Sequence, residues 1–213
     1  MRPPQDWRAA RATLWIAGVT AFAWLLVSTL GWDRAAAVYG GFIPGRVGGL
    51  ANDPAPLFAL LTPLTATLVH AGFLHLAFNL LMLVVCGRSI EPIIGARGVL
   101  ILYLVGAYAA AAAQWAADPG VFIPMVGASG AISAVVGAYA LLFGRNRVKV
   151  ANARLAAWLH ALWLGAAWIG LQVLVGLTFM TSGMSIAVAA HIGGFLAGLL
   201  LAKPLLWLRW RGA

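Results

Sequence analysis

A serine, two histidines and an asparagine stand out in this sequence because they are polar side chains within apolar segments. His75 and Asn79 lie four residues apart, Ser129 lies in the glycine-containing run Gly127–Gly130, and His191 lies in a later apolar run. Polar groups inside membrane segments are costly, so each of them is a candidate functional residue. A hydroxyl, a base and an amide together are the groups that acyl transfer requires.

Each of these groups has a distinct part in that chemistry. A serine hydroxyl is a weak nucleophile and needs a base within hydrogen-bond reach, which His191 can supply. His75 and Asn79 lie on one face of a helix at their spacing, so both can point toward one oxygen atom. Ser129 is expected to open a helix, where backbone N–H groups lack helical partners and offer a further donor to a tetrahedral intermediate.

The elements that must hold these groups are predicted to be membrane helices. Of the 213 residues, 63% are hydrophobic and 9% are charged, whereas soluble domains carry about 25% charged residues. The mean hydropathy is +0.94, and the apolar runs reach the length of about 20 residues that a bilayer requires. We therefore expect an all-α polytopic membrane protein, with residues 1–213 forming one membrane domain and no room for an appended soluble enzyme.

Six helices are predicted from the apolar runs that lie between charges, prolines and glycines. We expect them at about residues 12–30, 70–86, 98–117, 129–143, 156–178 and 186–208. The stretch Gly31–Pro63 between the first two is apolar, but its four prolines exclude a single helix. We expect this stretch to lie in the membrane interface.

The distribution of lysine and arginine predicts the orientation in the membrane. With six spans both termini lie on one side, and that side collects twelve basic residues, whereas the other side keeps only Arg34 and Arg46. The twelve are Arg2, Arg8, Arg11, Arg88, Arg97, Arg145, Arg147, Lys149, Arg154, Lys203, Arg209 and Arg211. Cytoplasmic segments carry an excess of these residues, so both termini are predicted to be cytoplasmic.

This orientation places the candidate residues at a common depth. The second, fourth and sixth predicted helices all run from the outer side to the inner side. His75 and Asn79 lie early in the second helix, Ser129 opens the fourth, and His191 lies early in the sixth. The four side chains are therefore expected to meet in the outer half of the membrane.

Structural explanations exist for each residue taken singly. The run Gly127–Gly130 is typical of close helix packing, and Gly194 with Gly198 forms a GxxxG pattern. Asn79 could hold two helices together, and Ser133 could bond back to a carbonyl of its own helix. Their convergence at one depth is what favours a shared chemical site over these separate explanations.

Other classes of function fit the pattern less well. A zinc protease of the HExxH type has two histidines four residues apart, whereas His70 and His75 are five apart with no glutamate between them. A proton-driven transporter carries carboxylates within its spans. The acidic residues here fall at helix ends or in loops: Asp6, Asp33, Asp53, Glu91 and Asp118. The net charge of +9 is spread over helix ends and does not indicate nucleic-acid binding. We expect no metal.

Three motifs together resemble the signatures of rhomboid intramembrane proteases. They are His70-Ala-Gly-Phe-Leu-His75-Leu-Ala-Phe-Asn79, Gly127-Ala-Ser129-Gly130 and Ala190-His191-Ile192-Gly193-Gly194, in this order on the second, fourth and sixth predicted helices. The likeness extends from about Thr62 to Gly198. It implies a six-helix rhomboid-like bundle with Ser129 as nucleophile and His191 as base. It further implies His75, Asn79 and the Ser129 backbone N–H as the oxyanion hole, Gly127, Gly130 and Gly194 as supporting motif positions, and no cofactor.

The resemblance also implies a substrate and further structural features. Similar proteins cut single-pass membrane proteins in the bilayer, within or near the outer edge of the substrate's span. Glu91 matches an acidic position that ties helix ends together, and Phe179–Ser185 matches a flexible cap over the site. Family members often carry an aromatic residue one turn after the serine, packed against the histidine, where this chain has Ser133. Either a different neighbour holds His191, or His191 is held less firmly.

Two alternatives to the protease stay open at this point. A catalytically inactive rhomboid-like protein would bind or move membrane segments; inactive relatives usually lack the serine or the histidine, and this chain keeps both. A purely structural bundle would tolerate apolar replacements of Ser129, His191 and Asn79. We expect a multi-pass protein of the cell (plasma) membrane.

Overall fold

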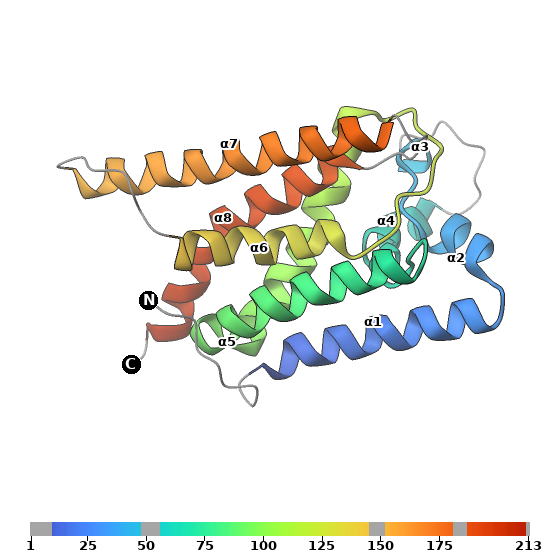
Figure 1. The fold of residues 1–213 in the computed structure, drawn as a ribbon, viewed down its shortest axis with the longest axis horizontal. Coiled ribbons are helices and arrows are strands. Elements are labelled where there is room, and N and C mark those ends of the chain that lie inside the picture. The colour runs from blue at the N-terminus through green and yellow to red at the C-terminus, as the bar shows by residue number, and fades with distance from the viewer. Residues whose placement is uncertain (1–9, 48–55, 145–151, 181–186, 212–213) are drawn as a thin grey trace.

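The computed structural model describes residues 10–47, 56–144, 152–180 and 187–211, and helices dominate these residues (Figure 1). In chain order they are α1 (Arg11–Thr29), α2 (Asp33–Gly40), α3 (Pro44–Val47), α4 (Pro56–Thr65), the 3-10 helix η2 (Ala66–Leu68), α5 (Phe73–Ala117), α6 (Ser129–Phe143), α7 (Ala153–Met180) and α8 (Val188–Trp210). The predicted all-α class is confirmed.

The length and composition of the helices fit a multi-pass membrane protein. Among the described helices, α1, α5 and α8 are long and apolar enough to cross a bilayer. The 15-residue helix α6 is apolar but shorter than a full span. It begins at Ser129, as predicted.

A single kink replaces one of the predicted loops. The helices expected at residues 70–86 and 98–117 are two arms of α5, and the chain stays helical between them except at Gly95, where φ is +78°. Glycine adopts this conformation without the steric cost that a Cβ brings. The first arm begins at Phe73, three residues after the start predicted at about residue 70, so His70 precedes the helix.

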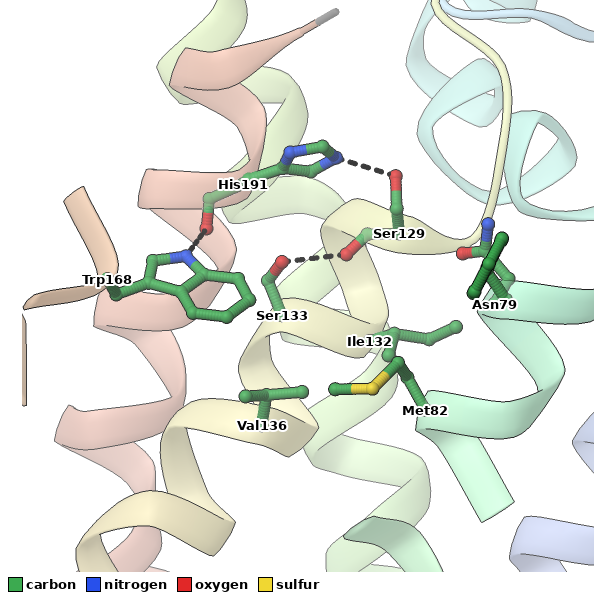
Figure 2. Close-up of a pocket in the computed structure, with 9 residues that line it drawn as sticks. Asn79, Met82, Ser129, Ile132, Ser133, Val136, Trp168 and His191 are labelled. Atoms are coloured by element: carbon green, nitrogen blue, oxygen red, sulfur yellow. Dashed lines mark hydrogen bonds between the residues drawn. The ribbon is translucent and has the colours of Figure 1, made fainter. Parts of the chain in front are cut away.

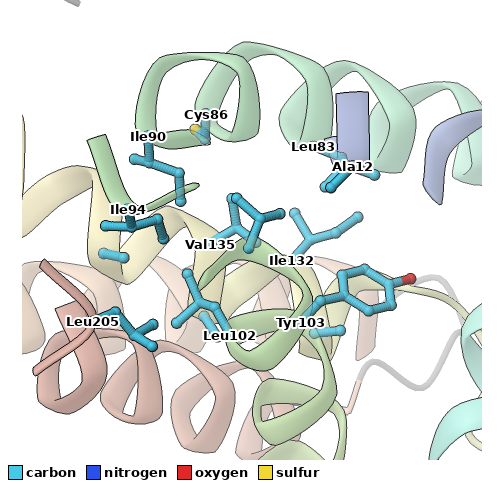
Figure 3. Packing of buried hydrophobic residues seen from close by; sticks show 14 of the residues in the cluster. Ala12, Leu83, Cys86, Ile90, Ile94, Leu102, Tyr103, Ile132, Val135 and Leu205 are labelled. Carbon is cyan, nitrogen blue, oxygen red and sulfur yellow. The ribbon is translucent and has the colours of Figure 1, made fainter. Parts of the chain in front are cut away.

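Helices α5, α6 and α8 form the core of the bundle. Branched apolar side chains such as Leu83, Leu102 and Val135 are buried in this core (Figure 3). On α8, a Cβ at Gly194 would overlap the carbonyl oxygen of Gly130, and one at Gly198 would overlap that of Ala134. These glycines therefore pack α8 directly on the backbone of α6, as their GxxxG spacing indicated.

The proline-rich stretch after α1 folds against the segment that leads into α6. Helix α2 follows the end of α1 and contacts both α1 and α4 (Figure 1). Phe42 pairs with Met125 through two backbone hydrogen bonds of 2.9 and 2.7 Å. The hydroxyl of Thr65 donates to the carbonyl of Gly40 at 2.6 Å. The stretch is broken into short helices and braces the loop that ends at Ser129.

Candidate active site

Ser129 and His191 are brought together by the contact between α6 and α8. Ser129 is the first residue of α6, and His191 lies in the first turn of α8. The distance from Nε2 of His191 to Oγ of Ser129 is 2.8 Å (Figure 2). This distance is typical of a hydrogen bond, and it lets the imidazole accept the hydroxyl proton. The pair has the geometry of a nucleophile with its base.

A cavity of about 150 Å³ opens beside this pair. Its polar lining includes Ser129, His191 and Asn79, while Met82 and Trp168 contribute apolar surface from α5 and α7 (Figure 2). A largely apolar cavity with a few convergent polar groups is the usual form of a small binding site.

Asn79 lies next to the cavity, and His75 lies next to the segment before Ser129. Asn79 is buried and lines the cavity, and its Nδ2 donates to the backbone oxygen of His75 at 2.8 Å. The Oδ1 atom of Asn79 is buried without a hydrogen-bond partner. The Nδ1 atom of His75 accepts a long hydrogen bond of 3.4 Å from the N–H of Ala71. A ring that accepts at Nδ1 carries its proton on Nε2 and can donate there.

Gly127 brings the ring of His75 close to the start of α6. Its φ is +113°, and a Cβ at this position would lie 2.7 Å from Cε1 and 2.8 Å from Nε2 of His75. Glycine is therefore required both for the backbone conformation and for the space that the imidazole occupies. The adjacent N–H of Ala128 donates to Nε2 of His70 at 3.4 Å. The predicted motif residues thus assemble around one loop.

Gly130 and Gly194 serve helix packing next to the pair. A Cβ at Gly130 would lie 2.5 Å from Cβ of Ala110 on α5, and Gly194 packs on the carbonyl of Gly130. Their small size allows α5, α6 and α8 to meet directly below Ser129 and His191. These two glycines support the geometry of the pair through close helix packing.

Trp168 is a residue of this site that sequence reasoning missed. Its Nε1 donates to the backbone oxygen of His191 at 3.2 Å, and its ring stacks on Phe195 at 4.9 Å between centroids. Ser133 does not contact the base through its hydroxyl, which donates to the carbonyl of Ser129 at 2.8 Å. A tryptophan in the middle of a predicted span, away from the membrane interface where this residue is common, was the available signal.

Two other predicted features lie elsewhere. The carboxylate of Glu91 accepts hydrogen bonds from Ala12 and Thr13 at the start of α1, so Glu91 ties helix ends together as expected. The proposed cap, residues 179–185, lies outside the side chains that the structure describes.

Comparison with known proteins places the chain among proteins of one family. The Rhomboid domain family matches residues 58–208. The chain is 32% identical to "Rhomboid protease GluP" of Bacillus subtilis over 68% of its own length and 25% of that protein. It is 32% identical to "Rhomboid-related protein 2" of Mus musculus over 62% of the chain and 43% of that protein. It is 33% identical to "Rhomboid protease GlpG" of Pectobacterium atrosepticum over 63% of the chain and 45% of that protein.

These alignments span less than half the length of each relative, and the matched family domain includes the candidate serine, histidines and asparagine. The match covers more than half of the chain. The chain therefore belongs to the rhomboid family.

Proposed function

We propose that this protein is an intramembrane serine endopeptidase that cuts transmembrane proteins in or near their membrane span. The single observation that carries the proposal is the 2.8 Å distance between Oγ of Ser129 and Nε2 of His191. Family membership and relatives named as proteases support the same reaction.

The reaction begins with the transfer of the Ser129 hydroxyl proton to Nε2 of His191. Oγ then attacks the carbonyl carbon of the scissile peptide bond, forming a C–O bond and a tetrahedral oxyanion. His191 gives the proton to the departing amine as the C–N bond breaks, which leaves an acyl ester on Ser129. A water molecule, deprotonated by His191, hydrolyses that ester and restores the hydroxyl.

Three donors are proposed to stabilise the oxyanion. The N–H of Ser129 is at the first position of α6, where the helix supplies no acceptor. Asn79 has a second amide hydrogen besides the one bonded to His75, and His75 can donate from Nε2. Donors already in place cost no reorganisation when the charge develops, and losing one typically slows such enzymes by about 10²–10³.

The substrate is proposed to be a transmembrane segment of another protein. The cavity beside Ser129 has an apolar lining from α5, α6 and α7, which suits an uncharged side chain next to the scissile bond. A peptide bond inside a helix must first leave its hydrogen-bonded turn, so segments that unwind easily are favoured substrates.

We further propose that residues 1–213 form one membrane domain, with both termini in the cytoplasm and the site in the outer half of the plasma membrane. The family match begins at residue 58, but α1 is joined to that region through Glu91. The orientation rests on the excess of arginine and lysine on the side of the termini.

A fluorophosphonate probe and a model transmembrane substrate test the proposal in proteoliposomes. We expect the natural chain to be labelled and to cut, and Ser129→Ala and His191→Ala to do neither. Ser89→Ala is the matched control, because the Ser89 hydroxyl bonds the carbonyl of Val85 within α5, outside the cavity lining. Labelling without cleavage would point to another acyl-transfer substrate. A folded natural chain that neither labels nor cuts would favour a binding protein instead.

A further inference from the structure

Trp168 contacts the helix that bears the base at two successive turns. Its indole N–H donates to the backbone oxygen of His191 (Figure 2). Its ring lies nearly parallel to that of Phe195, with an interplanar angle of 9°. Phe195 is four residues after His191, one helical turn further along α8. Trp168 therefore contacts the first two turns of α8 on the side that faces α7.

The bond to His191 restrains the rotation of the first turn of α8. A carbonyl oxygen has two lone pairs, so that of His191 can accept from the indole as well as from the helix. The direction of a histidine ring depends on how its backbone is turned, and here a 2.8 Å contact with Oγ of Ser129 depends on that direction. Positioning errors of about 1 Å cost roughly 10²-fold in catalysis.

The small side chain of Ser133 leaves space beside His191, and the aromatic contact to α8 comes from α7. Ser133, one turn after Ser129 on α6, carries a small side chain whose hydroxyl is turned back to the Ser129 carbonyl. The cavity that Ser133, Trp168 and His191 share is about 150 Å³, which is the size of a cavity that holds a benzene ring. Ser133 leaves this space unfilled, and the aromatic contact to the base-bearing helix comes from Trp168.

We propose that Trp168 is the positioning residue for the His191 base in this chain, so that the base is held from α7 instead of from α6. The inference rests on the proposed proteolytic function of Ser129 and His191. Its consequence is that the packing of α7 controls catalysis. Helix α7 packs mainly against α8 and only slightly against α6, so a displacement of α7 would release the bond to His191 and loosen the base.

Two replacements separate the parts of the contact. Trp168→Phe keeps an aromatic ring against Phe195 but removes the N–H donor, and we expect kcat to fall about two- to tenfold. Trp168→Leu removes both, and we expect a fall of roughly 10- to 100-fold with KM nearly unchanged. Trp163→Phe is the matched control on the same helix, because its side chain is 64% exposed; its kcat should equal that of the natural chain.

A second-site replacement distinguishes positioning from a general structural role. Adding Ser133→Phe to Trp168→Leu places an aromatic ring in the cavity beside His191, which is also the space proposed for a substrate side chain. We therefore expect the rate of fluorophosphonate labelling, and not kcat, to recover about two- to tenfold. A loss of labelling rate through general loosening of the fold would not recover. The rate of fluorophosphonate labelling is measured on the same variants, because it reports the Ser129–His191 pair without a transmembrane substrate.

Several outcomes would overturn the inference while the proposed function stands. In each of them the natural chain cuts its substrate. An unchanged kcat in the Trp168 variants would mean that Trp168 does not position the base. A higher kcat would make Trp168 an obstruction, and a raised KM alone would make it a substrate contact. If the natural chain is labelled but does not cut, proteolysis fails, and slower labelling of both Trp168 variants still supports the inference. If the natural chain is labelled no faster than Ser129→Ala, both the proposed function and the inference about Trp168 are overturned.

Discussion

Two polar clusters lie at the two ends of the first arm of α5, and they differ in how completely their groups are paired. Under the proposed orientation, the cluster at Glu91 is the inner cluster, and the cluster of His70, His75 and Asn79 is the outer cluster. At the inner cluster, the carboxylate of Glu91 accepts from the N–H of Ala12 at 2.8 Å, the N–H of Thr13 at 2.9 Å and the Thr13 hydroxyl at 2.7 Å. At the outer cluster, His70 and His75 accept backbone hydrogen bonds of 3.4 Å. Buried atoms of His70 and Asn79 there lack partners.

This difference in pairing indicates that the inner cluster stabilises the fold and that the outer cluster serves the reaction. A buried polar group that is fully paired stabilises the fold, and a carboxylate at the start of a helix also interacts favourably with its dipole. A buried donor or acceptor without a partner costs free energy, and such groups persist where they are needed for a transition state. We therefore expect changes at Glu91 to act on unfolding and changes at Asn79 to act on the reaction.

The largest effect is expected from removing the amide of Asn79. Asn79→Ala should lower kcat about 10²–10³-fold because one oxyanion donor is lost. The free energy of unfolding should change by only about 1 kcal/mol, since the side chain makes one hydrogen bond, to its own helix. Cleavage kinetics and thermal unfolding in the same detergent measure both quantities.

Asn79→Asp is the control for the donor itself. The carboxylate keeps the shape and the Oδ1 acceptor but has a second oxygen in place of the amide group, so it has no amide hydrogens and the kcat of this variant should fall as far as that of Asn79→Ala. Full activity of either variant would remove Asn79 from the oxyanion hole and leave it as a helix contact.

Residue type and the spacing of the apolar runs were enough to expect His75, Asn79, Ser129 and His191 close together. The structure brings Ser129 and His191 within 2.8 Å of each other, and their common depth in the membrane stays a prediction. The kink at Gly95 could not be predicted, since composition does not show which of the 25 glycines adopts a positive φ. The contact of Trp168 with His191 could not be predicted either, because a tryptophan in an apolar helix also fits a lipid-facing position.

The inner cluster was predicted only in part for a related reason. The resemblance indicated that Glu91 ties helix ends, but its hydrogen bonds reach residues 78 and 79 positions away. Which helix end it reaches depends on how α1 packs on α5, and helix pairing of this kind comes from tertiary packing that local patterns do not encode.

The next largest effect is expected at Glu91. Glu91→Gln replaces a carboxylate oxygen with an amide group that cannot accept from the start of α1, and charge-assisted hydrogen bonds contribute about 1.5–3 kcal/mol. We expect the free energy of unfolding to fall by about 3 kcal/mol, while kcat of the folded protein changes less than about twofold. Asp33→Asn is the control, because Asp33 is exposed and bonds only the nearby hydroxyl of Ser28. A catalytic defect without loss of stability would contradict the division between the clusters.

The smallest effect isolates a single hydrogen bond of the inner cluster. Thr13→Val keeps the volume of the buried side chain and the backbone N–H bond, and removes only the hydroxyl that donates to Glu91 at 2.7 Å. We expect a loss of about 1–2 kcal/mol in the natural chain and a clearly smaller loss when Glu91→Gln is already present. Groups that share one hydrogen-bond network are not additive, so the double-mutant cycle should give a coupling of about 1 kcal/mol. Additive losses would mean that the carboxylate of Glu91 and the hydroxyl of Thr13 act independently, and the inner cluster would then not be a cooperative network.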